Sequence, residues 1–270
     1  MRFSKFQFSI RVFWYLVVIF LYAPLLVVML FSFNEANTPT HITRFSLRWY
    51  HELFGDAVVL DAFKDSIILA VVSSTVSTVL GAMLGYGMYA HRGRRLGWLI
   101  WIIYLPIVTP DIIYGIAQLS FFTKVSDALG ILSPGLGTMI IAHISFQVPF
   151  VALLIYSRLV GLDPKLFDAC HDLYANATQR ARYFIVPTLR PALLAGFFLA
   201  FTLSIDDFVV SFFTAGPNST TLPIYIWSAI KKGITPEVNA AATVLIGAVF
   251  AVAVIMMAFQ YVRNVTRKTT

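Results

Sequence analysis

Residues 168–187 read DACHDLYANATQRARYFIVP and separate two long apolar runs of the chain. The stretch carries the potentially cationic side chains His171, Arg180 and Arg182, and Arg190 follows just beyond it. Charged side chains are costly in the hydrocarbon core of a membrane. A polar segment of this length between two apolar runs is therefore a helix or loop at the membrane surface rather than a span.

The composition indicates a membrane protein of one domain. Of the 270 residues, 59% are apolar and only 12% are charged, whereas a soluble domain of this size carries about a quarter charged residues. Since no polar block between the apolar runs is large enough to fold alone, residues 1–270 are expected to form a single transmembrane domain. The one cysteine, Cys170, excludes an internal disulfide.

Six apolar runs set the expected fold. A helix that crosses the ~30 Å hydrocarbon core needs about 20 residues. Runs of this length cover about residues 12–33, 66–89, 98–122, 137–160, 191–213 and 240–262. They predict an all-α membrane protein with six transmembrane helices and a loop of residues 161–187 between the fourth and the fifth. Within the second run, Gly81 and Gly85 form a small-xxx-small face suited to close helix contact.

The distribution of basic residues predicts the orientation. A net charge of +7 would suggest nucleic-acid binding in a soluble protein, but in a membrane protein Lys and Arg mark the cytoplasmic side. Both termini, the turn after the second run and the 158–190 segment hold 14 of the 20 Lys and Arg residues, and the opposite loops hold 6. Both termini and the 161–187 loop are therefore expected in the cytoplasm, and no nucleic-acid partner is expected.

Three acids fall inside the expected spans. Asp111 lies in the third, and Asp206 and Asp207 lie in the fifth. A carboxylate within a span costs a few kcal/mol, so its default interpretation is functional. Both spans start on the cytoplasmic side, and the helical rise places Asp111 about 20 Å and Asp206 about 22 Å along them. The three acids are therefore expected at one depth, in the outer half of the membrane.

Helical spacing predicts which polar side chains share a face. Ser204, Asp207 and Ser211 follow at i, i+3 and i+7, so they share one stripe, and Asp206 points about 100° away. In the fourth span, His143 lies at a depth similar to that of the acids. A patch of acids and polar groups at one depth is what a cation pathway needs, because a desolvated ammonium must exchange water for carboxylate oxygens and polar dipoles.

Several of these residues have a structural interpretation as well. Asp111 fits a helix that restarts after Pro110, since Asp is a normal residue at a helix N-terminus. His143 fits a packed, hydrogen-bonded side chain better than a ligand. Trp49 and Tyr50 fit an interfacial aromatic belt, although an aromatic pair also binds alkyl-ammonium groups by cation–π contact.

The motifs of enzymes are missing from the sequence. It has no G-x-x-x-x-G-K-[ST] loop for ATP, no metal-ligand spacing and no Ser-His-Asp or Cys-His set. The chain is therefore expected to have no catalytic residue, no metal and no cofactor of its own.

The spacing within residues 168–187 resembles the EAA loop of ABC-importer permeases, in which Glu-Ala-Ala is followed by Gly and later by Ile-x-Leu-Pro. Those positions hold Asp168, Ala169, Cys170, Tyr174 and, at the end, Pro187. In that family the loop forms a short helix that docks into a groove on a cytosolic ATPase. The stretch alone is equally compatible with an ordinary amphipathic connector.

Motifs along the rest of the chain resemble the permease subunits of spermidine/putrescine ABC importers. They are Tyr22-Ala23-Pro24, Arg48-Trp49-Tyr50, Pro110-Asp111-Ile112, FQVPFVALLIYSRLVGLD at 146–163, FTLSIDDFV at 201–209 and Pro236-Glu237-Val238-Asn239-Ala240. The resemblance runs from the first span to the last, and FTLSIDDFV is its most specific part.

The resemblance implies a type I ABC-importer permease fold with a cytoplasmic coupling helix, in the inner membrane of a bacterium. The implied partners are a second permease in a heterodimer, an ATPase dimer that binds ATP and magnesium, and a periplasmic polyamine-binding protein. It assigns substrate passage to Trp49, Asp111, Ser204, Asp206 and Asp207. It assigns ATPase coupling to Asp168, Ala169, Cys170, Tyr174 and Pro187.

Two other functions compete with import of polyamines. An importer for another organic cation would use the same acids, which disfavour an anionic cargo. A stand-alone cation carrier or channel would also use them, but it does not explain the EAA spacing. Co-purification of a cytosolic ATPase would distinguish an importer from a stand-alone carrier or channel.

Overall fold

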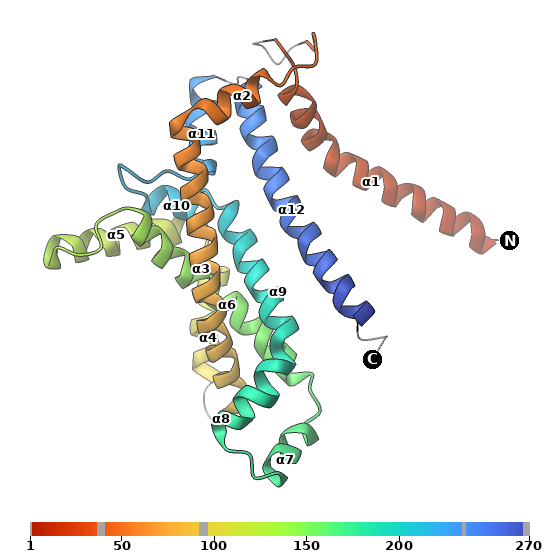
Figure 1. The fold of residues 1–270 in the computed structure, drawn as a ribbon, viewed down its shortest axis with the longest axis vertical. Coiled ribbons are helices and arrows are strands. Elements are labelled where there is room, and N and C mark those ends of the chain that lie inside the picture. Colours follow the sequence, from red (N-terminus) through yellow and green to blue (C-terminus); the bar gives the residue numbers. More distant parts are fainter. Residues whose placement is uncertain (1, 37–40, 92–96, 234–235, 267–270) are drawn as a thin grey trace. The chain divides into compact units, whose positions relative to one another are not determined.

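The computed structural model describes residues 2–36, 41–91, 97–233 and 236–266, and these are almost entirely helical (Figure 1). The elements are α1 (Arg2–Ser32), α2 (Arg48–Gly55), α3 (Ala57–Ala90), α4 (Gly97–Val108), α5 (Asp111–Leu129), α6 (Leu136–Val160), α7 (Lys165–Asp172), α8 (Ala177–Arg180), the π-helical segment η1 (Ala181–Ile185), α9 (Val186–Ile205), α10 (Val209–Thr214), α11 (Leu222–Lys232) and α12 (Pro236–Thr266). This order confirms the all-α class.

The long apolar helices account for most of the expected spans. Four helical segments are long and apolar enough to cross a membrane, namely Gln7–Ser32, Ala57–Ala90, Leu136–Val160 and Ala177–Ile205. A fifth crossing is added if α4 and α5 form one broken span. Within the described part of α12, the apolar portion Pro236–Ala251 is shorter than a full span. The total of six spans therefore stays a prediction.

The chain forms two compact units. Unit 1 comprises Met1–Leu60 and Tyr225–Thr270, and unit 2 comprises Asp61–Ile224. In unit 1, α1 packs against α12, and α12 also contacts α2. In the part of α1 whose side chains are described, from residue 7 on, most apolar side chains are exposed, as expected for a helix whose surroundings are apolar.

Asn34 fixes the turn between α1 and α2 in unit 1. Its side-chain amide donates to the carbonyl of His41 (2.6 Å), and its Oδ1 accepts from the backbone N–H of Thr43 (2.8 Å). The carbonyl of Asn34 accepts from Nε1–H of Trp49 (2.6 Å), whose side chain is only 6% exposed. The buried indole therefore attaches α2 to the end of α1.

A second polar contact joins α11 to the start of α12. The hydroxyl of Tyr225 donates to Oε1 of Glu237 at 3.1 Å. Burial, followed by the negative charge of Glu237, raises the pKa of Tyr225 to about 12. The hydroxyl therefore remains a neutral donor at any physiological pH.

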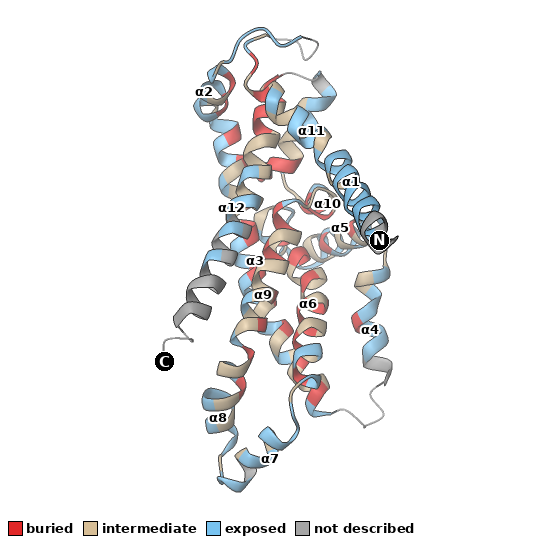
Figure 2. Ribbon diagram, turned by 90° about the vertical axis from the view of Figure 1, so that its right-hand side faces the viewer, coloured by how far each residue is buried: buried red, intermediate tan, exposed pale blue. Residues whose placement is uncertain are grey.

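The core of unit 2 is built around α6. Buried positions recur along this helix (Figure 2), among them Met139, Ala142, Val151 and Ile155. Helix α9 packs along α6, and α4 and α10 also contact it. A helix that is apolar on nearly all sides and packed by several neighbours occupies the centre of a bundle.

Helix α3 approaches α6 through glycine. A Cβ at Gly81 would lie 2.6 Å from Cβ of Val151, and a Cβ at Gly85 would lie 2.5 Å from the carbonyl oxygen of Ala152. Only a residue without a side chain allows this approach. The small-xxx-small face expected from the sequence therefore contacts α6.

The third expected span differs from a straight helix. The chain bends by 107° between α4 and α5, at Thr109 and Pro110. Proline has no N–H for the helix ladder and disfavours the helical conformation of the residue before it. Helix α5 then begins at Asp111, which confirms a helix restart at this point. The run 98–122 is thus two helices.

The fifth expected span begins earlier than predicted and breaks before its end. Its helical path starts at Ala177, within the stretch expected to be a loop, and passes through η1 into α9. Before Pro187, which lacks an N–H, the helix makes a π turn, in which the N–H of Val186 bonds to the carbonyl of Ala181 five residues earlier. After Ile205 the helix stops, and α10 begins at Val209.

Replacement of Gly85 by Ala is expected to destabilise unit 2. The new methyl group meets a backbone carbonyl that cannot rotate away, and overpacking of this kind costs about 1–3 kcal/mol. Gly87→Ala in the same helix is the matched control, because nothing lies within 4 Å of its Cβ position. Thermal unfolding in detergent should show a lower midpoint for the Gly85 variant alone, and equal midpoints would contradict the packing.

Candidate functional site

A cavity of about 390 Å³ lies in unit 2 where the two helix breaks occur. The end of α4, the start of α5, the middle of α6 and the α9–α10 break all contribute to it. Its lining residues are Pro106, Ile107, Asp111, Tyr114, Phe146, Phe150, Leu203, Asp206, Asp207, Phe208, Val209 and Val210. The volume is that of a typical small-molecule site.

Three carboxylates and several aromatic rings give the cavity its chemistry. Asp111, Asp206 and Asp207 are the acids of the lining, and no basic residue from the described part of the chain lines the cavity. Tyr114, Phe146, Phe150 and Phe208 supply aromatic rings. Carboxylates attract cations, and aromatic faces stabilise ammonium groups by cation–π contact. The arrangement is therefore suited to an organic cation with apolar parts.

The two adjacent acids at the break differ in their partners. Asp207 is 12% exposed, and its Oδ2 accepts from the backbone N–H of Ser211 at 2.8 Å, while Oδ1 lies 3.4 Å from the N–H of Val210. It thus satisfies N–H groups in the first turn of α10 that have no partner within the helix. Asp206 is exposed, and in the described part of the chain its carboxylate accepts no hydrogen bond from another residue.

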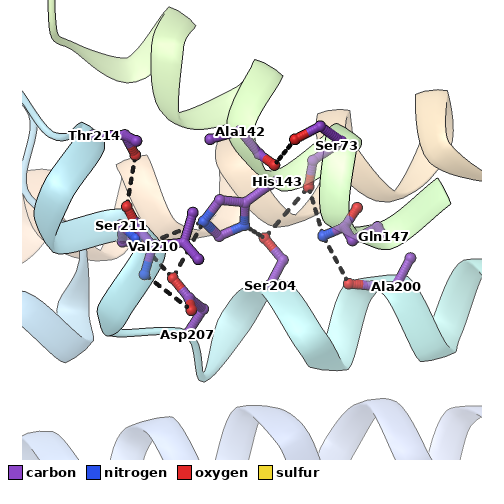
Figure 3. A network of polar contacts seen from close by, with 11 residues as sticks. Ser73, Ala142, His143, Gln147, Ala200, Ser204, Asp207, Val210, Ser211 and Thr214 are labelled. Carbon is purple, nitrogen blue, oxygen red and sulfur yellow. Dashed lines mark hydrogen bonds and ion pairs between the residues drawn. The ribbon is translucent and has the colours of Figure 1, made fainter. Parts of the chain in front are cut away.

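A buried polar network extends from Asp207 into the interior (Figure 3). Nε2 of His143 lies 3.4 Å from Oδ2 of Asp207 and 3.0 Å from the hydroxyl of Ser211, and Nδ1 lies 2.8 Å from the hydroxyl of Ser204. His143 is completely buried. It therefore connects α6 to both sides of the helix break.

The network continues along α6 to α3. Ser73 donates to Ser204 (3.3 Å), and the amide nitrogen of Gln147 donates to Ser73 (3.3 Å) and to the carbonyl of Ala200 (3.1 Å). Ser77 donates to the amide oxygen of Gln147 at 2.9 Å. These contacts join three helices through side chains that are satisfied by one another, as buried polar groups must be.

The structure brings together most of the residues expected to guide substrate. Asp111, Asp206 and Asp207 line one cavity, while Ser204 lies behind it in the polar network. Trp49 belongs to unit 1, where its indole is buried against Asn34. The prediction that Ser204, Asp207 and Ser211 share one continuous helical stripe is wrong, because α9 ends at Ile205. His143 nevertheless contacts both serines.

Sequence reasoning missed several residues of this site. The rings of Phe146, Phe150 and Phe208 were not distinguished from other aromatic residues of the spans. Ser73 and Ser77 lie one helical turn apart within an apolar run, and this spacing was a usable signal for a buried polar contact. The interpretation of His143 as a packed, hydrogen-bonded residue is consistent with its contacts.

The expected coupling residues lie at the far end of α6 from its N-terminal turn, around the short helix α7 (Figure 1). Asp168, Ala169 and Cys170 are part of α7, and Pro187 is the second residue of α9. Phe167 anchors α7, since its ring lies 5.2 Å from that of Tyr89 in α3 and 5.1 Å from that of Phe184 in η1.

Tyr174 occupies the position of the glycine in the EAA pattern. Its φ is +53°, in the left-handed region that favours glycine, and its side chain is 95% exposed. The turn after α7 therefore has the backbone conformation for which the pattern uses glycine. A hollow of about 350 Å³ lies beside it, lined by Cys170, Leu173, Ala175, Gln179, Arg180, Tyr183 and Phe184.

Comparison with known families decides the class of protein. The model of the family described as binding-protein-dependent transport system inner membrane component matches residues 77–269, which is more than half of the chain. The chain belongs to this family. It is therefore a non-catalytic permease component of an ABC importer in the inner membrane, and a stand-alone carrier or channel is set aside.

Curated relatives match over most of the chain. The spermidine/putrescine transport system permease protein PotC of Escherichia coli K12 is 36% identical over 84% of each chain. The putrescine transport system permease protein PotI of the same organism is 37% identical over 85% of this chain and 83% of its own. PotC of Haemophilus influenzae is 34% identical over 87% of this chain and 89% of its own.

Solved structures of ABC importers share the fold. A bacterial transporter that imports the acidic polysaccharide alginate aligns with a TM-score of 0.72 over 96% of both chains, at 14% identity. The MetNI methionine transporter aligns with a TM-score of 0.64 over 76% of this chain and 95% of its own, at 18% identity. The ABC-importer permease fold expected from the sequence is thereby confirmed.

Asp207→Ala is expected to destabilise the protein more than Asp206→Ala. The first change removes the acceptors of two backbone N–H groups and a contact of His143, and loss of hydrogen bonds to a buried charged group costs about 1–3 kcal/mol. The second change affects an exposed side chain and should stay within about 0.5 kcal/mol. Thermal unfolding of the two purified variants measures the difference, and the reverse order would refute the assigned roles.

Proposed function

We propose that this permease moves polyamines, such as spermidine or putrescine, from a periplasmic binding protein to the cytoplasm, with ATP hydrolysed by a partner ATPase. The observation that supports it best is the cavity at the α9–α10 break, where three carboxylates and four aromatic rings meet without a basic residue in the lining. The names of the relatives agree with this cargo.

The cavity suits the chemistry of a linear polycation. Each ammonium group of a polyamine needs an anionic or dipolar partner when it loses water, and the methylene segments between them favour apolar walls. Asp206 and Asp111 supply exposed carboxylates, and Phe146 and Phe150 supply apolar walls. Another organic cation with separated charges is the alternative cargo, while an anion would be repelled.

The residues of the site have different roles in this proposal. Asp206 and Asp111 contact the cargo directly, and Asp207 adds negative charge while it holds the start of α10. Ser204 acts from behind, through His143. Passage along Trp49 stays a prediction, since its indole is buried within unit 1.

Membership of the family supports the following assembly. The chain pairs with a second permease, a binding protein docks on the periplasmic side, and an ATPase dimer that binds ATP and magnesium contacts α7 from the cytoplasm. The exposed Asp168 and Ala169 and the half-exposed Cys170 form the docking face of α7, with Tyr174 at its end. Closure of the ATPase dimer moves α7, and the spans then open outward to receive the cargo. The 14-to-6 division of basic residues supports both termini in the cytoplasm.

Neutralisation of the exposed carboxylates is expected to impair uptake. Asp206→Asn and Asp111→Asn should each lower the initial rate of spermidine uptake about tenfold per intact complex, because a partner of a desolvated ammonium is lost. Asp206→Glu should retain more activity, since the charge stays. The measurement is uptake of labelled spermidine and putrescine by proteoliposomes that contain the assembled importer and its binding protein.

Asp127→Asn is the matched control for these variants. Asp127 is an exposed acid of α5, like Asp111, but it does not line the cavity. Its neutralisation should leave uptake unchanged. Normal uptake by an Asp111→Asn, Asp206→Asn, Asp207→Asn triple variant would exclude a cation pathway through this cavity.

Cys170 provides a direct test of orientation and docking. A membrane-impermeant maleimide should label it from the cytoplasmic side only, and bound ATPase should slow the reaction at least severalfold, because α7 is then covered. Asn218→Cys in a Cys170→Ser background should react from the periplasmic side only. Labelling of both positions from one side would refute the topology, and unchanged labelling with the ATPase bound would refute docking at α7.

A further inference from the structure

The hydrogen bonds of the buried network behind the cavity run in one donor-to-acceptor direction, which the groups at the ends of the network determine. The carbonyl of Ala200 can only accept, so the amide group that faces it must be the nitrogen of Gln147. The second N–H of this nitrogen donates to Ser73, and Ser73 in turn donates to Ser204 (Figure 3). The hydroxyl hydrogen of Ser204 is then left for its remaining neighbour, which is Nδ1 of His143.

This direction fixes the state of the imidazole ring. When Nδ1 accepts from Ser204 at 2.8 Å, the neutral ring carries its hydrogen on Nε2. Nε2 faces Oδ2 of Asp207 at 3.4 Å and the hydroxyl of Ser211 at 3.0 Å. The chain of donors therefore reaches Ser211, whose hydroxyl accepts from the Nε2–H, and this N–H also lies beside the negative charge of Asp207.

The position of His143 shows how this contact can act. Its ring is completely buried and is not among the residues that line the cavity, so it does not touch the cargo. Asp207 is both a lining residue and the partner of the first turn of α10. A donor behind this carboxylate holds it in one orientation toward the cavity. The side chain of Asp207 then loses less conformational entropy when the cargo binds.

We propose that His143 is a positioning residue for translocation, which holds the Asp207 carboxylate at the cavity wall because its Nε2–H bonds to Ser211 and lies beside Asp207, with the tautomer set by Ser204, Ser73 and Gln147. The proposal rests on the proposed cation pathway and deepens it. It assigns a function to a buried histidine that contacts neither the cargo nor a partner protein.

Two substitutions of His143 separate the two faces of the ring. The amide nitrogen of Asn reaches roughly the position of Nδ1, and that of Gln roughly the position of Nε2. His143→Asn keeps a polar contact to Ser204 but loses the N–H that bonds to Ser211 beside Asp207, and uptake per intact complex should fall about tenfold. His143→Gln keeps a donor near Asp207, and it should retain most of the wild-type rate.

A double-mutant cycle tests whether His143 acts through Asp207. If it does, His143→Asn combined with Asp207→Asn should be no slower than Asp207→Asn alone, because the group to be positioned is already absent. If His143 matters only for packing, His143→Asn and His143→Gln should lower uptake equally. The fold-loss of uptake from His143→Asn should then multiply with the fold-loss from Asp207→Asn in the double variant. Either of these results would overturn the proposal.

Ser204→Ala provides the same test if His143→Asn fails to assemble. It removes one hydroxyl and leaves the imidazole without its fixed tautomer, so uptake should fall about threefold in the wild-type background and not at all in the Asp207→Asn background. Asp206→Asn, measured in parallel, separates the cation-pathway hypothesis from the positioning hypothesis. If Asp206→Asn does not lower uptake, the cation pathway is refuted. If Asp206→Asn lowers uptake but the His143 and Ser204 variants do not, only the positioning role is refuted.

Discussion

A helix that breaks inside an apolar medium must find partners for the backbone groups that the break frees, and the site of this permease follows from that constraint. Asp207 accepts from the first turn of α10, and His143 contacts both Asp207 and the serines on either side of the break. An unpaired carboxylate at this depth would be costly. The acid, the histidine and the break therefore stabilise one another.

In the proposed mechanism, the same arrangement leaves two carboxylates available for a cargo. Asp111 and Asp206 are exposed at the cavity, whereas Asp207 is largely engaged by the protein. A translocation site must bind its cargo well enough to admit it and weakly enough to release it. Exposed carboxylates meet this requirement, because water replaces the cargo at little cost when it leaves.

The sequence was sufficient for the class, for the approximate positions of four long apolar helices and for the grouping of the three acids, because apolar length and intramembrane charge are strong local signals. It was insufficient for the two breaks. Pro110 was known, but the size of the bend depends on how α5 packs against α10. The break at Asp206 has no proline or glycine to mark it, so the face of each acid could not be derived from a continuous helix. His143 contacts Asp207 only because of that break.

Helix α7 and the polar network behind the cavity both contact α3 and the path from η1 to α9, so a force on α7 from an ATPase would have a packed route. Phe167 of α7 contacts Tyr89 of α3 and Phe184 of η1. About 24 Å along α3 from Tyr89 lies Ser73, and about 30 Å along the path from Phe184 lies Ser204, by the rise of a helix. These two serines bond to each other behind the cavity. A shift of α7 that moved α3 against α9 would therefore act on the bond between these serines, and through Ser204 on His143 and on the Asp207 carboxylate at the cavity.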